Sequence, residues 1–332
     1  MSQRARYIVG VDLGGTNIVV GAMPEDGSRE IAFRSQPTHA AQGADLVVER
    51  MIQMIEDVIT VVIAETGATR ADFLGVGVGA PGPLDRALGM VITAPNLGWK
   101  MFPLRERIQS ATGLQTTLDN DANCATLGEW FTGAARGAKN VIGVTIGTGI
   151  GGGIIIDGKL FHGSSDVAGE IGHMTIDSTG RRCGCGNYGC LEAYASGTAI
   201  AERAREALAS EVDGVLFRMC GGDLTKITAQ MVYKAATDAD PVAVDVVRET
   251  ARFLGAGIGA LLNVLNPDVV VLAGGVVNAG EALFGPLKAE VRRRAFAPAV
   301  DACRIVPGEL GGSAGVVGAI AGFKAQTGIT SA

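Results

Sequence analysis

The sequence predicts an α/β protein built from two related lobes, and three observations carry that prediction. Runs rich in β-branched residues alternate with segments of helical periodicity, which is the pattern of α/β architectures. Residues 7–22 and 141–158 each consist of a β-branched run, a glycine/threonine turn and a second β-branched run, so one strand-turn-strand unit occurs twice. At 332 residues the chain also exceeds the length at which a single hydrophobic core stops growing. We therefore expect a duplicated fold.

The turns of the two repeated units are candidate phosphate-binding loops. Glycine has no Cβ, so backbone N–H groups in such turns are open to phosphate oxygens. One such turn is weak support, because glycine-rich hairpins occur without ligands, but two copies suggest a nucleotide between the halves of the fold. Residues 77–82 and 147–152 also fit the dinucleotide pattern G-x-G-x-x-G. We reject that interpretation because Pro81 and Pro83 break the first match and a strand-like run follows the second, where a helix is required.

The other elements follow from periodicity and end signals. Strands are expected at Phe73 to Val78, Gln115 to Leu118 and Val269 to Leu272. Asn266 and Pro267 are typical of a helix end, and the string Asp119-Asn-Asp-Ala-Asn123 is typical of a helix start. Helices are expected at Ala44 to Thr66, Leu104 to Thr112, Cys124 to Phe131, Gly197 to Glu211, Thr228 to Ala236, Pro241 to Leu265, Gly280 to Phe296 and Gly312 to Ala325.

The composition favours a cytoplasmic globular enzyme. Hydrophobic residues make up 47% of the chain and charged residues 19%, and the formal net charge is −6. This acidic balance argues against a nucleic-acid partner, and the triplet Arg292-Arg293-Arg294 is interpreted as a solvated helix face. We expect no export segment, because Asp12 cuts off the first apolar run, and no membrane span, because no uncharged apolar stretch is long enough.

A cluster of cysteines with one histidine predicts a metal site. His173, Cys183, Cys185 and Cys190 form a Cys₃His set, and such a set closes a tetrahedron around structural zinc. Cysteines clustered in this way, without an export segment, are interpreted as metal ligands rather than as disulfide partners. The flanking carboxylates, Glu170 and Glu192, would then be held near one point and suit a ligand rich in hydroxyl groups. The alternative is a zinc-braced loop with ordinary surface glutamates nearby.

Four motifs resemble those of the ROK family of bacterial sugar kinases and repressors. They are Asp12-Leu-Gly-Gly-Thr-Asn17, Asn120-Asp-Ala-Asn123, Gly169-Glu-Ile-Gly-His173 and Cys183-Gly-Cys-Gly-Asn-Tyr-Gly-Cys190-Leu-Glu192. The resemblance runs from residue 7 to about residue 325, and Pro95-Asn-Leu-Gly-Trp99 with the overall length most resembles the glucokinase branch. One departure is Asp119, where many relatives carry glutamate, and we expect it to affect only a contact behind the site.

The resemblance implies an α/β, two-domain, actin/hexokinase-like fold, which is a duplicated ribonuclease-H-like fold with an interdomain cleft. The small domain is expected at residues 1–119 plus about 312–332, and the large domain, with the zinc segment, at residues 120–311. The small domain is expected to rotate toward the large one when sugar binds.

The resemblance also assigns catalytic and nucleotide-binding roles. Asp121 would be the general base; a helix N-cap is the alternative, although one residue of its string can cap while another faces the substrate. Asp12 would hold magnesium, and its alternative is a turn former. The remaining nucleotide contacts would come from glycine-rich loops, which alone would be ordinary turns: Gly14, Gly15 and Thr16; Gly147, Thr148 and Gly149; and, on the adenosine side, Gly274 and Gly275.

For the sugar, the resemblance points to carboxylates, amides and one imidazole. Charged acceptors strengthen hydrogen bonds to hydroxyl groups, and one nitrogen of a zinc-bound histidine can face the sugar while the other holds the metal. The zinc would be structural, because a Cys₃His set leaves no open ligand position. The expected sugar contacts are Asn96, Asn120, Asp121, Glu170, His173 and Glu192.

The expected function is ATP-dependent phosphorylation of glucose to glucose 6-phosphate by a homodimer or homotetramer, with Mg²⁺ and structural Zn²⁺. N-acetylmannosamine, fructose or allose remain possible substrates, and polyphosphate a possible donor. A sugar-responsive repressor is disfavoured because only six residues precede the first strand, too few for a helix-turn-helix. A sugar-binding protein without catalysis is disfavoured because Asp121 is present.

Overall fold

The computed structural model describes residues 5–208 and 213–329, which form two compact units. Within these residues, the first unit comprises 5–138, 153–169 and 308–329, and the second comprises 139–152, 170–208 and 213–307. This division follows packing and assigns the helix after residue 120 to the first unit. The sequence places the domain boundaries after residue 119 and near residue 312. Those boundaries refer to domains that rotate as rigid bodies, and they stay a prediction.

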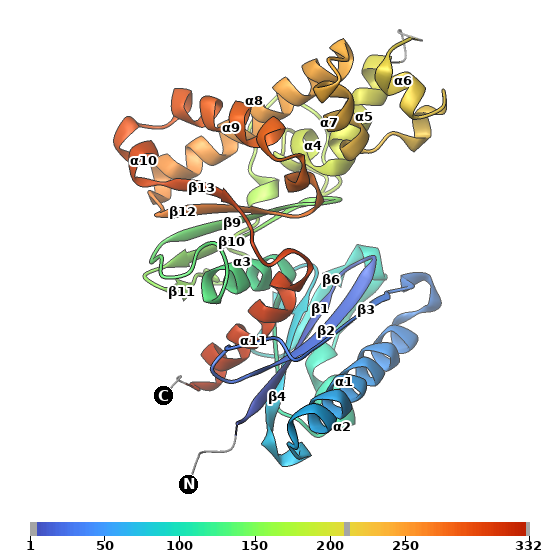
Figure 1. Cartoon of the computed structure of the whole chain (residues 1–332), viewed down its shortest axis with the longest axis vertical. Helices are drawn as coiled ribbons and strands as arrows, with labels where there is room; N and C mark the ends of the chain where they lie inside the picture. The colour runs from blue at the N-terminus through green and yellow to red at the C-terminus, as the bar shows by residue number, and fades with distance from the viewer. Residues whose placement is uncertain (1–4, 209–212, 330–332) are drawn as a thin grey trace. The chain divides into compact units, whose positions relative to one another are not determined.

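The first unit is built on a five-stranded sheet in the order β3-β2-β1-β4-β8 (Figure 1). The strands β1, β2 and β3 are antiparallel neighbours, whereas β4 runs parallel to β1 and β8 parallel to β4. A second, three-stranded sheet has the order β5-β6-β7. The strands are β1 Tyr7–Leu13, β2 Asn17–Pro24, β3 Ala32–Pro37, β4 Phe73–Ala80, β5 Leu84–Asp85, β6 Met90–Ala94, β7 Trp99–Phe102 and β8 Thr116–Asn120.

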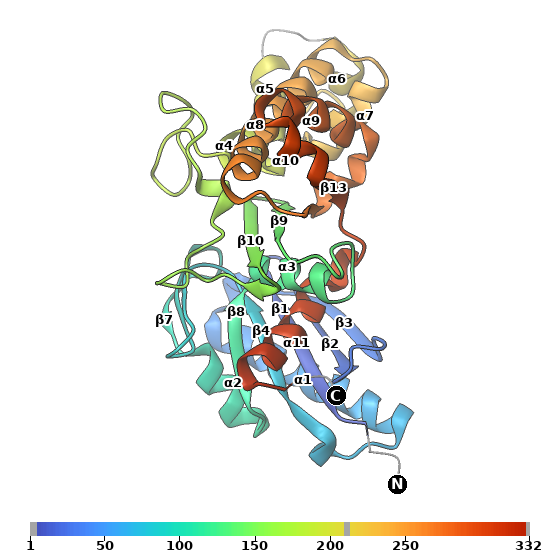
Figure 2. The ribbon, with the colours of Figure 1, turned by 90° about the vertical axis from the view of Figure 1, so that its left-hand side faces the viewer.

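Helices cover both faces of the five-stranded sheet. One core joins the strands to α1 Ala44–Thr66 and α2 Leu104–Thr112. A smaller core on the opposite face joins Ile8 of β1 to Ile320 and Phe323 of α11 Ala314–Thr327. α11 also packs along α3 Asp121–Phe131, and Figure 2 shows it lying against β1 and β4.

Glycines in the strands allow α11 to approach the sheet closely. A Cβ on Gly77 would lie 2.0 Å from the carbonyl oxygen of Ala319, and one on Gly10 would lie 2.3 Å from that of Val316. A Cβ on Gly318 of α11 would lie 1.6 Å from the carbonyl oxygen of Cys124 in α3. These glycines therefore serve packing rather than ligand binding. Gly77 lies within the strand β4, which agrees with our rejection of a dinucleotide-binding loop at residues 77–82.

Glu129 fixes α3 to the segment that leads into α11. Its side chain, 1% exposed, accepts hydrogen bonds from the backbone N–H groups of Ala134, Glu309 and Leu310 at 3.0, 3.0 and 2.9 Å. We predict that Glu129→Leu lowers the free energy of unfolding by ~3–5 kcal/mol, because three partly buried backbone donors lose an acceptor that is itself buried. Denaturant unfolding measures this change. Glu129→Gln keeps one acceptor oxygen and should cost clearly less; equal losses in the two variants would contradict the assignment.

The second sheet has the order β11-β10-β9-β12-β13. Its strands are β9 Val141–Ile146, β10 Ile150–Ile156, β11 Lys159–Leu160, β12 Val269–Ala273 and β13 Arg304–Pro307. The two sheets share one order of pairing. In the first sheet β1 pairs in parallel with β4, and β4 with β8. In the second sheet β9 pairs in parallel with β12, and β12 with β13. The predicted duplication is confirmed by this matching order.

Helices of the second unit pack on one continuous core that includes β9 and β12. The long α8 lies next to α9, α7 and α5. The helices are α4 Glu192–Ala195, α5 Gly197–Leu208, α6 Val215–Met219, α7 Ala229–Thr237, α8 Pro241–Leu265, α9 Glu281–Arg294 and α10 Ala297–Ala302. Among the described residues, no helix is long and apolar enough to cross a membrane.

Every long element expected from periodicity is present. The expected bounds of α1, α2 and α8 agree with the structure, and the predicted helix from Gly197 to Glu211 ends at Leu208 within the described residues, since 209–211 lie outside them. The predicted start of α3 at Cys124 was wrong by three residues, because Asn120 already caps the helix. Also not predicted were β3, with only Ala32 buried, and the short elements β5, β6, β7, β13, α4, α6 and α10.

Candidate active site

The first expected phosphate loop joins β1 to β2 in the first unit. The N–H of Gly14 bonds the carbonyl of Asn17 at 2.9 Å, and the Thr38 hydroxyl bonds the carbonyl of Gly14 at 2.7 Å, so the turn is held from both sides. Gly15 and Thr16 are exposed. A Cβ on Gly15 would lie 3.4 Å from Cβ of Asn96, so this expected sugar contact lies beside the loop.

Two carboxylates near this loop lie close enough to repel each other. Asp12 lies at the end of β1, and Asp121 is the first residue of α3. Burial and the charge of Asp121 raise the pKa of Asp12 to about 7. The first turn of α11 lies against the same group, since a Cβ on Gly315 would lie 2.3 Å from Oδ2 of Asp12. A pair of carboxylates under mutual repulsion is an arrangement that a bound cation stabilises.

The helix cap is made by Asn120 and not by Asp121. Oδ1 of Asn120 accepts hydrogen bonds from the N–H groups of Ala122 and Asn123 at 2.9 and 3.1 Å. Oδ1 of Asp121 accepts a further bond from Ala122 at 2.8 Å, and its side chain is partly exposed. One residue of the Asn-Asp string therefore caps the helix while the next presents a carboxylate at the helix N-terminus, where the backbone dipole favours negative charge.

The second expected phosphate loop, between β9 and β10, opens onto a cavity of about 780 Å³ within the second unit. Gly147, Thr148 and Gly275 line this cavity, as the sequence predicted for phosphate and adenosine contacts. Gly149 and Gly274 are not among its lining residues. Gly149 lies against Glu192, and Gly274 adopts φ +95 with no room for a Cβ beside Ile146.

Further lining residues of the cavity were missed by sequence reasoning. They come from α5, α7 and the turn after β12, and their polar members are Thr198, Arg205, Thr228, Gln230, Tyr233, Lys234, Thr237 and Asn278. The helical pattern predicted α5 and α7, but nothing in it distinguishes a face that lines a cavity from a solvated face. A volume of this size accommodates a ligand as large as a nucleotide.

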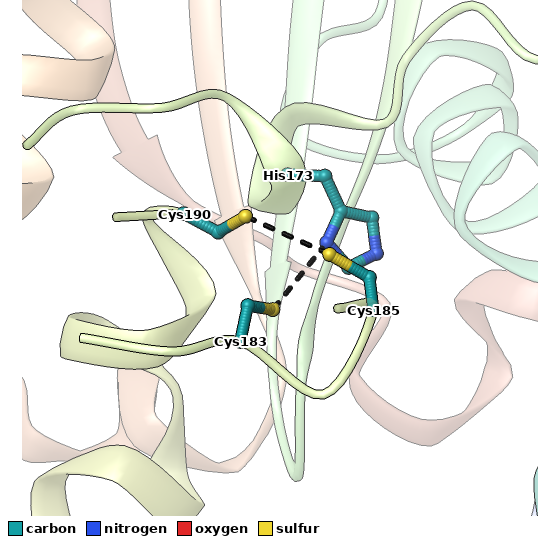
Figure 3. A group of neighbouring side chains, drawn as sticks. All are labelled: His173, Cys183, Cys185 and Cys190. Carbon is teal, nitrogen blue, oxygen red and sulfur yellow. Dashed lines mark hydrogen bonds between the residues drawn. The ribbon is translucent and has the colours of Figure 1, made fainter. Parts of the chain in front are cut away.

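The predicted Cys₃His cluster is present in the second unit. The ligand atoms of His173, Cys183, Cys185 and Cys190 all lie within 4.8 Å of one another (Figure 3). Sγ of Cys185 and Sγ of Cys190 are 3.7 Å apart, and Sγ of Cys183 is 3.8 Å from Nδ1 of His173. Zinc–ligand bonds of about 2.0–2.3 Å in a tetrahedron require ligand separations of roughly 3.5–3.8 Å. The two separations above match that range, and the residue types are those that zinc prefers.

The protonation of the cysteines also fits a cation. Burial raises the pKa of Cys183 to about 12 and raises the pKa of Cys190, whereas a backbone hydrogen bond from Asn187 lowers the pKa of Cys185. Without a cation, burial disfavours thiolates in this cluster. A metal ion offsets that cost, because it binds the deprotonated form.

The flanking carboxylates lie beside the cluster, as predicted. Nε2 of His173, the nitrogen that points away from the cysteines, is 4.0 Å from Oε2 of Glu170. Oε1 of Glu192 lies 3.7 Å from Sγ of Cys183, and its Oε2 accepts the N–H of Ile150 at 2.8 Å. The imidazole therefore has one nitrogen at the metal position and one beside a partly exposed carboxylate.

The structure thus groups the expected site residues in two sets. Asp12, Asn96, Asn120 and Asp121 belong to the first unit with the loop of Gly14, Gly15 and Thr16. Glu170, His173 and Glu192 belong to the second unit with the cysteines and the loops at Gly147 and Gly274.

Comparison with known proteins gives the same assignment over nearly the whole chain. The family model described as ROK family matches residues 8–326. A glucokinase from Halalkalibacterium halodurans is 38% identical over 318 residues, which cover 94% of this chain and 93% of that protein. A putative xylose repressor from Caldicellulosiruptor sp. is 31% identical over 321 residues, which cover 97% of this chain and 79% of that protein.

Solved structures agree. A ROK family glucokinase from Streptomyces griseus in complex with glucose and AMPPNP has a TM-score of 0.77 at 36% identity, covering 95% of this chain and 98% of that one. A ROK hexokinase from Thermus thermophilus has a TM-score of 0.80 at 33% identity, covering 97% and 99%. The predicted actin/hexokinase-like fold is confirmed by these neighbours. From its motifs, its paired sheets and these matches, the chain belongs to the ROK family.

Proposed function

We propose that this chain is an ATP-dependent hexokinase that phosphorylates glucose to glucose 6-phosphate. The observation that carries the proposal is the placement of Asp121, whose carboxylate stands at the start of α3 beside Asp12 while Asn120 takes the helix cap. Relatives named glucokinase at 34–38% identity support the substrate and the enzyme class.

Asp121 is the general base in this proposal. It accepts the proton of the sugar hydroxyl as that oxygen attacks the terminal phosphate of ATP, which is the proton transfer that a kinase must supply. The helix N-terminus stabilises the ionised carboxylate before the reaction begins. The charges of Asp12 and Asp121 repel each other, and a cation bound at Asp12 would offset that repulsion.

The nucleotide is bound by glycine loops in both units. Gly14, Gly15 and Thr16, with Gly147, Thr148 and Gly149, provide backbone N–H groups for phosphate oxygens, and Gly274 and Gly275 bind on the adenosine side. The repulsion between Asp12 and Asp121 fits a divalent cation, and we assign Mg²⁺ to Asp12. Bound there, Mg²⁺ would neutralise phosphate charge during transfer.

The sugar is held by Asn96, Asn120 and Asp121 from the first unit and by Glu170, His173 and Glu192 from the second. Structural Zn²⁺ at His173, Cys183, Cys185 and Cys190 would fix the ring of His173 and leave Nε2, which has Glu170 beside it, available to the sugar. We also propose that the chain assembles as a homodimer or homotetramer, as the family resemblance implies.

A sugar-responsive repressor is the second candidate, because a putative xylose repressor is among the relatives. Asp121 favours the kinase, since a protein that only senses sugar has no need of a general base. The other hexoses considered above, and polyphosphate as donor, are alternatives within the kinase class.

A panel of hexoses in a coupled assay of ADP release tests the proposal. We predict that glucose gives the highest kcat/KM with ATP, above N-acetylmannosamine, fructose and allose. One displaced hydroxyl leaves a buried partner unpaired, which is expected to cost ~10-fold or more in kcat/KM. A higher kcat/KM for another hexose would reassign the substrate. Sugar binding with no phosphorylation from either ATP or polyphosphate would favour the repressor class.

A further inference from the structure

Four ionisable side chains are joined directly behind the proposed base, in the first unit. Asp119, 4% exposed, receives the Nε2–H of His162 at its Oδ2, at 2.9 Å. The same Oδ2 lies 3.3 Å from Nε of Arg86. Asp166 completes the set: its Oδ2 accepts a hydrogen bond from the backbone N–H of Arg86 at 3.2 Å, and its Oδ1 lies 3.4 Å from Nη1 of Arg86. Arg86, Asp119, His162 and Asp166 are called the Asp119 network below.

The other oxygen of Asp119 holds the junction between β8 and α3. Oδ1 accepts the backbone N–H of Asn120 at 2.9 Å and Nδ2 of Asn123 at 3.2 Å. Gln326 of α11 adds a long contact to Oδ2, at 3.4 Å. Because Asn120 caps α3 and Asp121 is its first residue, the orientation of the Asp119 carboxylate sets the position of the backbone that carries the base.

The partners of Asp119 come from two distant segments, and each segment is itself held in place. The carbonyls of Arg86 and Ala87 accept hydrogen bonds from Nη1 and Nη2 of Arg105, both at 3.0 Å. The segment with His162 and Asp166 is closed by a bond from the N–H of Ala168 to the carbonyl of His162 at 3.1 Å.

A packing role alone accounts poorly for this arrangement. A buried ion pair is rarely a better source of stability than apolar side chains of the same volume, so a network of this kind is better explained by the geometry that it imposes. Here the geometry is that of the residue next to the base. Neither His162 nor Arg86 belongs to the sugar or nucleotide contacts proposed above.

We propose that His162 and Arg86, acting through Asp119, are positioning residues that hold Asp121 in its reactive geometry. The inference rests on the proposed function, in which Asp121 is the general base. Displacing a reacting group by a fraction of an ångström lowers the rate of the chemical step. It has a far smaller effect on the affinity of a separate nucleotide cavity.

The test compares His162→Leu, which removes the donor, with His162→Gln, whose Nε2 can still donate to Asp119. We expect kcat to fall ~10-fold or more in His162→Leu, with KM for ATP within about two-fold of wild type, and to recover largely in His162→Gln. Arg107→Leu is the matched control, because its ion pair with Asp45 at 2.6 Å lies on the surface of the same unit. It should leave kcat unchanged.

A second measurement does not depend on turnover. Hydrogen–deuterium exchange of a peptide covering residues 117–124 should be faster in His162→Leu than in wild type, and unchanged in His162→Gln and Arg107→Leu. If His162→Leu fails to fold, Asp166→Asn replaces it. Asp166 has φ +59, which asparagine tolerates, and the substitution removes only the charge paired with Arg86. A smaller fall in kcat, ~3-fold, with faster exchange of the peptide is expected from this more peripheral change.

Two results would overturn the positioning role. One is an equal loss of kcat in His162→Leu and His162→Gln. The other is unchanged kcat together with unchanged exchange in His162→Leu, or in Asp166→Asn if that variant is used instead. If the wild-type protein phosphorylates no hexose, the proposed function fails, whereas the exchange comparison still decides whether the network orders the β8–α3 junction.

Discussion

Asp121→Asn is expected to lower kcat for glucose phosphorylation by ~10²-fold or more while sugar affinity changes by less than about ten-fold, the usual pattern for loss of a general base. Asparagine keeps an oxygen that can accept the N–H of Ala122, which Asp121 binds at 2.8 Å, so the start of α3 is preserved. The substitution therefore removes the basic carboxylate and little else. Steady-state kinetics with glucose and ATP, together with glucose binding by calorimetry, separate the two effects.

Asp45→Asn serves as the control for Asp121→Asn. Asp45 is exposed and pairs with Arg107 at 2.6 Å in the same unit. It should retain wild-type kcat. Turnover in Asp121→Asn close to that of wild type would contradict the assignment of Asp121 as the base. A loss of glucose affinity as large as the loss of kcat would mean that Asp121 acts in binding instead.

Cys185→Ser is expected to weaken glucose binding by ~10²-fold or more. Sγ of Cys185 lies 3.7 Å from Sγ of Cys190, and Cys185 is a proposed metal ligand without being a proposed sugar contact. Loss of the metal frees the ring of His173, whose Nε2 lies 4.0 Å from Oε2 of Glu170. The two side chains are then no longer held in position to bind the sugar. Two charge-assisted hydrogen bonds at ~1.5–3 kcal/mol each account for the expected size.

The position of the Glu192 side chain should change less than that of Glu170, because Oε2 of Glu192 also accepts a hydrogen bond from the N–H of Ile150 at 2.8 Å. ATP affinity should change little, since the cavity at Gly147 and Gly275 has no lining residue from the cluster. Elemental analysis should give about one zinc per wild-type chain and clearly less in the variant. Cys303→Ser, outside the cluster, is the control. A folded, zinc-free Cys185→Ser protein that binds glucose normally would leave zinc as a brace for its loop.

Long periodic elements could be predicted from the sequence because burial on one face leaves a repeating pattern. The 25 residues of α8 carry that pattern between Asp240, which caps the helix, and Asn266 in a left-handed conformation at its end. The edge strand β3 could not be predicted, since five of its six residues are exposed. The short α4, although it carries Glu192, offers too few residues for any period to be visible.

The cysteine cluster could be predicted because zinc requires particular side chains at short spacings, and these are visible in one stretch of chain. The Asp119 network could not, because its members lie at residues 86, 119, 162 and 166 and only the tertiary fold brings them together. Asp119 stands out in the sequence as a departure from the resemblance, but its partners have no local signature. The same holds for the cavity walls, where Thr198 and Thr228 look like ordinary helix-start residues.

Transfer of a phosphoryl group from ATP to glucose, with Asp121 as the base, is the proposal on which the other predictions depend. The most direct measurement is ³¹P NMR of a reaction containing the wild-type protein, Mg²⁺, ATP and glucose, with Asp121→Asn run in parallel. The resonance of glucose 6-phosphate is expected to grow at the rate at which ADP appears, with almost no product from the variant. Release of inorganic phosphate without a sugar phosphate, or equal product from both proteins, would contradict it.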